Sequence, residues 1–90
     1  MVKLLDEIHP GEILLEDFMK PMGIDAQRLA TDMDVELGLI NDIVQCKHPI
    51  TTDTAQRLGL FFGMEARFWL HLQSEYNARI AARNLGRSAA

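Results

Sequence analysis

The sequence is poor in the residues that support metal, disulfide or nucleophilic chemistry. Its one cysteine, Cys46, excludes an internal disulfide and a zinc site built on cysteines. The three histidines lie at no metal-ligand spacing, the only serines are Ser74 and Ser88, and no glycine-rich phosphate loop is present. We therefore expect a protein that is not an enzyme and that holds no metal and no cofactor.

Long apolar runs are also missing. The densest apolar stretch, residues 58–64, is far shorter than the roughly 18 residues that a membrane helix needs, and it contains two glycines. Acidic residues at positions 6 and 7 come too early for a secretory signal peptide. We expect a cytoplasmic protein with no membrane contact and no small-molecule substrate.

Runs of alternating β-branched residues, which predict strands, are absent as well. Apolar residues recur at helical spacing instead. The 90 residues suffice for one hydrophobic core, and the 48% hydrophobic and 24% charged content is ordinary for a folded chain. The sequence therefore predicts one all-α domain over residues 1–90.

Five helical segments can be delimited from their apolar stripes and end signals. Pro21 and Gly23 are predicted to end the first segment, and Asp25 is suited to cap the second. Thr51 or Thr52 is expected to cap the fourth, and Gly63 to end it. The segments cover about 10–19, 25–33, 36–45, 52–62 and 65–84. The second and third, joined by about three residues, predict a helix-turn-helix over about 25–46.

Four motifs occur in order over about residues 8–77. They read HPGEIL at 9–14, INDIV at 40–44, ITTDTAQRL at 50–58 and FWLHLQ at 68–73. In this order and spacing they resemble the HigA branch, also called VapI-like, of the λ-repressor-like (XRE) family. The resemblance implies a five-helix λ-repressor-like DNA-binding domain whose third helix reads the major groove.

The same resemblance implies a function. It indicates the antitoxin of a type II toxin–antitoxin system, a homodimer that neutralises a HigB-like, ribosome-dependent mRNA endonuclease. It also implies that the antitoxin binds double-stranded operator DNA and so represses its own operon. Glycine is usual in the family where this chain has Cys46, so we expect Cys46 to replace a left-handed cap residue.

The predicted DNA contacts lie on the helix-turn-helix and the loop after it. Arg28 and Lys47 are suited to phosphates, whereas Asn41 and residues 36–39 are suited to base edges and thymine methyl groups. The full set is Gln27, Arg28, Glu36, Leu37, Gly38, Leu39, Asn41, Lys47, His48 and Thr51.

Charge leaves two alternative functions open. Residues 25–51 hold two Lys or Arg against five acidic residues, and the whole chain has a net charge of −4. Phosphate neutralisation supplies much of DNA affinity. The alternatives are a stand-alone XRE regulator without a toxin and a protein-interaction module that has lost DNA contacts.

Two further surfaces carry alternative interpretations. An apolar stripe on the last helix, predicted as either core or dimer interface, comprises Phe68, Leu72, Tyr76 and Ile80, with Trp69 beside it predicted for the core. An acidic N-terminal set either keeps the protein soluble or attracts a basic partner, and it comprises Asp6, Glu7, Glu12, Glu16 and Asp17.

Overall fold

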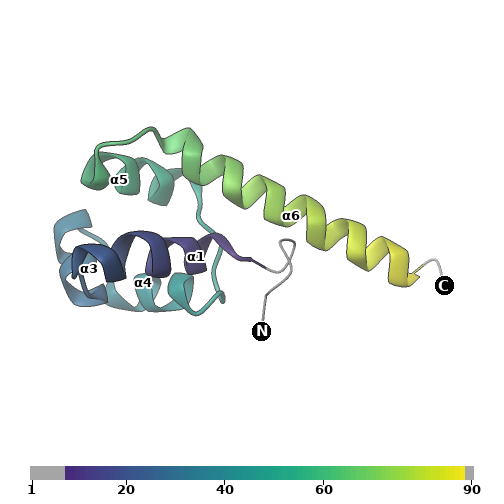
Figure 1. Cartoon of the computed structure of the whole chain (residues 1–90), viewed down its shortest axis with the longest axis horizontal. Coiled ribbons are helices and arrows are strands. Elements are labelled where there is room, and N and C mark those ends of the chain that lie inside the picture. Colours follow the sequence, from purple (N-terminus) through teal and green to yellow (C-terminus); the bar gives the residue numbers. More distant parts are fainter. Residues whose placement is uncertain (1–7, 89–90) are drawn as a thin grey trace.

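The computed structural model describes residues 8–88, and within that range it contains helices and turns but no strand. The elements are α1 (Pro10–Ile13), η2 (Leu14–Met19), α2 (Lys20–Met22), α3 (Ala26–Met33), α4 (Leu37–Val44), α5 (Thr52–Phe62) and α6 (Ala66–Ser88). The first three follow one another without a break, so they form one helical rod (Figure 1). This rod and the other four helices confirm the predicted all-α, five-helix fold.

The first rod is longer than predicted. The predicted end near Met19 is wrong, because the rod passes through Pro21 and continues to Met22. It closes at the other predicted end residue, Gly23, which has a left-handed φ of 67°. The reason is the π-helical segment η2, in which the Lys20 N–H donates to the carbonyl of Leu15, five residues back. A proline in a regular helix clashes with the carbonyl four residues back, and the wider π turn accommodates its ring.

His9 begins the first rod as a buried N-cap. Its Nδ1 accepts a hydrogen bond from the Gly11 N–H at 2.9 Å, and its ring meets Tyr76 of α6 edge-on at 4.9 Å. Burial lowers the pKa of His9, and the negative charge of Glu12 opposes that shift in part. The imidazole is therefore held neutral, which is the form that can accept the capping bond.

The other helix ends follow the predicted caps. Asp25 accepts from the Arg28 N–H at 2.8 Å to begin α3, and Thr51 accepts from the Thr54 N–H at 3.4 Å to begin α5. Gly63 ends α5 with a left-handed φ of 69°.

The end of α6 differs from the prediction. This helix reaches Ser88 and so passes the predicted end near residue 84, because Gly86 disfavours a helix by only about 1 kcal/mol and does not stop it.

The hydrophobic core is shared by all five helical rods. Its fully buried side chains include Leu14, Leu29, Ile40, Ile43, Leu58 and Trp69. Trp69 is 0% exposed, which confirms its predicted place in the core. The second half of α6 extends away from this body, as Figure 1 shows. None of the helices described over residues 8–88 combines the length and the apolar content needed to cross a membrane.

Candidate nucleic-acid interface

α3 and α4 form the predicted helix-turn-helix. α3 buries Leu29, Ala30 and Met33, and α4 buries Ile40 and Ile43, so the two helices share the core on one side. The turn between them passes through a residue with left-handed backbone, Asp34, at φ 58°. Aspartate tolerates this conformation better than most residues, so the turn is compact without a glycine.

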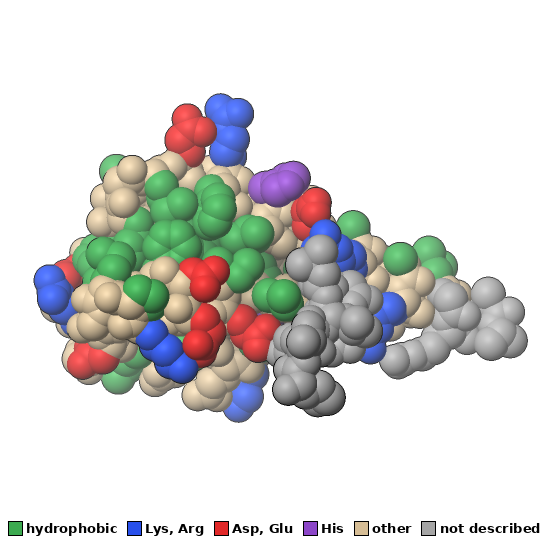
Figure 2. All heavy atoms as spheres, viewed as in Figure 1, with side chains coloured by type: hydrophobic (Ala, Val, Ile, Leu, Met, Phe, Trp, Pro, Cys, Tyr) green, Lys and Arg blue, Asp and Glu red, His purple; other side chains and the backbone are tan. Residues whose placement is uncertain are grey.

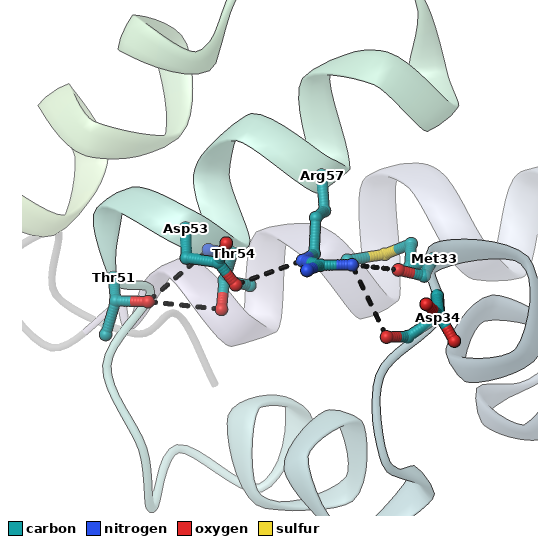
Figure 3. A network of polar contacts seen from close by, with 6 residues as sticks. All are labelled: Met33, Asp34, Thr51, Asp53, Thr54 and Arg57. Carbon is teal, nitrogen blue, oxygen red and sulfur yellow. Dashed lines mark hydrogen bonds and ion pairs between the residues drawn. The ribbon is translucent and has the colours of Figure 1, made fainter.

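Arg57 of α5 fixes that turn from outside the motif. One guanidinium N–H group donates to the carbonyl of Met33 at 2.8 Å, and the same nitrogen lies 3.4 Å from the carbonyl of Asp34. Asp53 holds the guanidinium from the other side at 3.0 Å, as Figure 3 shows. The last carbonyls of a helix lack partners within it, so Arg57 stabilises the end of α3 and the start of the turn.

A close backbone contact positions α4 against the first rod. A Cβ built on Gly11 would overlap the backbone carbonyl oxygen of Ile43. Only glycine permits this approach of α1 to α4. Cys46, the last residue of the predicted helix-turn-helix, has φ 65°, which confirms the predicted left-handed cap.

The first turn of α4 is open to solvent. Glu36, Leu37 and Gly38 are exposed, and a Cβ built on Gly38 meets nothing within 4 Å. Glu36 stands at the N-cap, but no side chain caps the helix. Because Gly38 carries no side chain on this exposed turn, another molecule can approach the backbone of α4 closely there.

Cations around this surface are few. Arg28 lies 3.4 Å from Asp32, which offsets part of its charge, while Lys47 is exposed in the loop after α4. The Nδ1–H of His48 donates to the carbonyl of Pro49 at 2.7 Å, so Nε2 remains as the outer polar atom of the ring. Gln27 donates to Thr31 at 3.3 Å and is exposed.

The loop after α4 is attached to α6. The buried side chain of Gln73 accepts from the Ile50 N–H at 2.8 Å and donates to Asn77 at 3.0 Å. A hollow of about 270 Å³ lies between this loop and α6, and it is lined by both Lys47 and His48. The loop that carries the predicted phosphate contact is therefore positioned by α6.

The structure places the ten predicted DNA contacts on α3, on α4 and its N-cap, and in the segment before α5. Seven are exposed, and Leu39, Asn41 and His48 are half-buried. Sequence reasoning missed two residues that position this surface, Arg57 and Gln73. The available signals were an Asp–Arg pair four residues apart on a helix, and a glutamine four residues after Trp69, on the apolar side of its helix.

The predicted apolar stripe of α6 divides into two parts. Phe68 is 38% exposed and packs beside Trp69 and Phe18, while Leu72 lines a hollow with Ile13. Farther along, Tyr76 and Ile80 are half-buried, with Tyr76 against His9. The first pair thus lies over the body of the protein, and the second leads onto the extended half of α6.

Metal binding finds no support in the part of the chain that the structure describes. Among residues 8–88, no group of three or more His, Cys, Asp or Glu side chains is placed to hold an ion. Two members of the acidic N-terminal set, Asp6 and Glu7, lie outside the described residues. Glu12, Glu16 and Asp17 lie within them, along the first rod.

Comparisons with known proteins find curated relatives and solved structures similar to this chain. No family model matches the chain. Virulence-associated protein I of Dichelobacter nodosus is 47% identical over 74 residues, which cover 82% of this chain and 68% of that protein. Antitoxin HigA-1 of Vibrio cholerae is 32% identical over 66 residues, covering 73% of this chain and 62% of its own. The chain thus spans about two thirds of the length of these curated relatives.

A solved structure extends the likeness to the fold. The antitoxin HigA of Pseudomonas aeruginosa, solved with the higBA promoter, superposes with a TM-score of 0.87 at 40% identity. The match covers 91% of this chain and 89% of that one, so it includes the helix-turn-helix and most of α6.

Proposed function

The chain belongs to the HigA-type antitoxins of the XRE helix-turn-helix family, and on that premise we propose that it neutralises a toxin and represses its own operon. The toxin is a HigB-like mRNA endonuclease, and the operon is repressed through operator DNA. Both tasks are binding alone, without an enzymatic step. A repressor works beside the DNA, so we place this activity in the cytoplasm.

One observation carries the operator-binding proposal. The open first turn of α4, with Gly38 uncovered, belongs to a motif whose counterpart in the Pseudomonas HigA structure was solved with promoter DNA. Asn41 and residues 36–39 supply the base contacts, with Leu37 and Leu39 suited to thymine methyl groups. Arg28, Lys47, His48 and Thr51 supply the backbone contacts, together with Gln27.

Operator binding is tested by gel shift on the DNA upstream of this gene. A salt series with non-specific DNA as competitor should show specific binding that weakens as salt rises. Replacing Lys47 by alanine should lower the salt slope by about one without changing sequence preference. A folded dimer that prefers no upstream sequence over the competitor would refute the proposal.

The acidic character of the motif favours one second candidate. Arg28 is already paired with Asp32, which leaves Lys47 as the exposed cation of residues 25–51 that pairs with no other residue in the described part of the chain. A helix-turn-helix with so little positive charge is suited to a protein-interaction module that no longer reads DNA. Toxin neutralisation without any operator shift would identify that candidate.

The homodimer is proposed to form along the extended half of α6. Tyr76 and Ile80 lead onto it, and Leu85 there is 71% exposed. A second copy covering this segment would bury these apolar side chains and place two copies of α4 for an inverted repeat. Light scattering should report a dimer that Ile80→Glu dissociates, whereas Leu60→Glu, on the 86% exposed Leu60, should leave it intact.

A further inference from the structure

A second surface, between the first rod and α6, combines apolar and acidic side chains. We call it the docking face, and define it as Ile8, Ile13, Phe18, Phe68 and Leu72 with the acidic rim Glu12, Glu16 and Asp17. Figure 2 shows hydrophobic side chains gathered in the middle of this view, with acidic side chains along their lower edge. None of the ten predicted DNA contacts belongs to it.

The apolar part of the docking face is open rather than closed over. Phe18 stands 6.1 Å from Phe68 edge-on and 5.0 Å from Trp69, and Phe68 remains 38% exposed. Two hollows of about 160 and 220 Å³ adjoin it and share Ile8 and Ile13 in their linings. Ile8, Ile13, Phe18 and Leu72 are half-buried around it. Adjoining apolar side chains that remain partly open to solvent are typical of a site where another molecule binds.

The charge of the acidic rim limits which kind of molecule can bind the docking face. Glu16 pairs with Lys20 at 2.8 Å, but no ion pair joins Asp17 to another described residue. The rim is therefore net negative, which disfavours nucleic acid and anionic membranes. A second copy of the chain docked face to face would bring two acidic rims together, and like charges at an interface oppose association.

A basic protein satisfies both properties of the docking face. A ribonuclease must carry positive charge to hold RNA, and an apolar centre with a charged rim is the usual anatomy of a protein interface. We propose that the docking face binds the toxin, with Phe68 in the centre and Asp17 as a steering charge. This proposal rests on the antitoxin function proposed above, and it separates the toxin surface from the DNA surface.

Two pairs of variants test the docking face. Asp17→Lys reverses an exposed rim charge, and Glu65→Lys makes the same change on an exposed carboxylate outside the face. Phe68→Ser removes the central ring, and Leu60→Ser removes an apolar side chain that is 86% exposed on α5. Asp17→Lys touches no buried group, so the test survives even if Phe68→Ser weakens the fold.

The probe is the purified protein encoded immediately beside this gene, titrated against each full-length variant by calorimetry. We expect Asp17→Lys to weaken binding about tenfold and Phe68→Ser by more than tenfold, with both control variants unchanged. Raising the salt concentration should weaken wild-type binding more than Asp17→Lys binding. Operator gel shifts should be the same for all variants.

Three results would overturn the inference, and they are distinguishable. If all variants bind the probe as tightly as wild type, the docking face is wrong while the antitoxin function stands. If the docking-face variants dissociate the dimer at unchanged toxin affinity, the face joins two copies of the chain. If the wild-type protein itself fails to bind the probe, the proposed neutralisation fails together with the face.

Discussion

The two ends of α4 are held in different ways. The end toward Val44 is fixed by buried contacts, the close approach of Gly11 to Ile43 and the bond from Ile50 to Gln73. The end toward Glu36 follows a turn fixed by the half-exposed side chain of Arg57. Buried packing tolerates little displacement, whereas a solvated ion pair can re-form at little cost. The end that is proposed to meet DNA is therefore the adjustable one.

The largest expected effect comes from the buried end. Gly11→Ala places a methyl group on the carbonyl oxygen of Ile43, which should destabilise the fold by about 3 kcal/mol or more. Urea denaturation followed by circular dichroism measures the loss. Unchanged stability would show that α1 can move away from α4, and the buried end would then be no more rigid than the other.

Gln73→Leu should give the next largest loss. It leaves the buried Ile50 N–H without its acceptor, which costs about 2 kcal/mol. Asn77→Ala is the matched control, because it removes the other partner of Gln73 and keeps the bond to Ile50. Equal losses in the two variants would mean that the loop after α4 does not depend on this bond.

Removing the Arg57 contact at the Glu36 end of α4 should affect operator binding more than stability. Arg57→Met removes the donor to Met33 but keeps an apolar stem, so the loss should be only about 1 kcal/mol for a side chain that is 38% exposed. Operator affinity should fall about tenfold because the start of α4 is no longer fixed. Arg67→Met, which removes the same charge from an 84% exposed site, should change neither quantity.

Gly38→Ala should change stability and operator affinity in opposite directions. No protein atom lies within 4 Å of the new Cβ, so the helix should gain about 1 kcal/mol. The same methyl group lies on the surface proposed to enter the groove, so operator affinity should fall. A variant that is more stable and binds as tightly as wild type would place the first turn of α4 away from DNA.

The smallest effect compares the two left-handed residues that flank α4. Cys46→Gly should raise stability by about 0.5 kcal/mol, since cysteine at φ 65° is strained. Asp34→Gly, at φ 58°, should change it little because aspartate tolerates that conformation. The melting temperatures of the two variants, measured side by side, test this prediction. A higher melting temperature for Asp34→Gly but not for Cys46→Gly would contradict it.

The sequence predicts the helices, their caps and the core well because each depends on neighbours a few residues away. The apolar spacing around Leu29, Ile40 and Trp69 was enough to assign them to the interior. The contacts that hold α4 were not predictable, because Arg57 and Gln73 bind backbone groups 23 or 24 residues away. No residue pattern shows where a distant backbone carbonyl or N–H group is left without a partner in its own segment.

Gly11 gives the two proposed binding surfaces a thermodynamic connection. The rod that carries the acidic rim begins at α1, and α1 touches α4 at Gly11 through backbone atoms with no side chain between them to deform. A toxin that displaces the first rod would therefore displace the DNA-reading helix as well. By linkage, any factor by which the toxin changes operator affinity is the factor by which the operator changes toxin affinity. A single glycine would then couple the binding of the two proposed ligands.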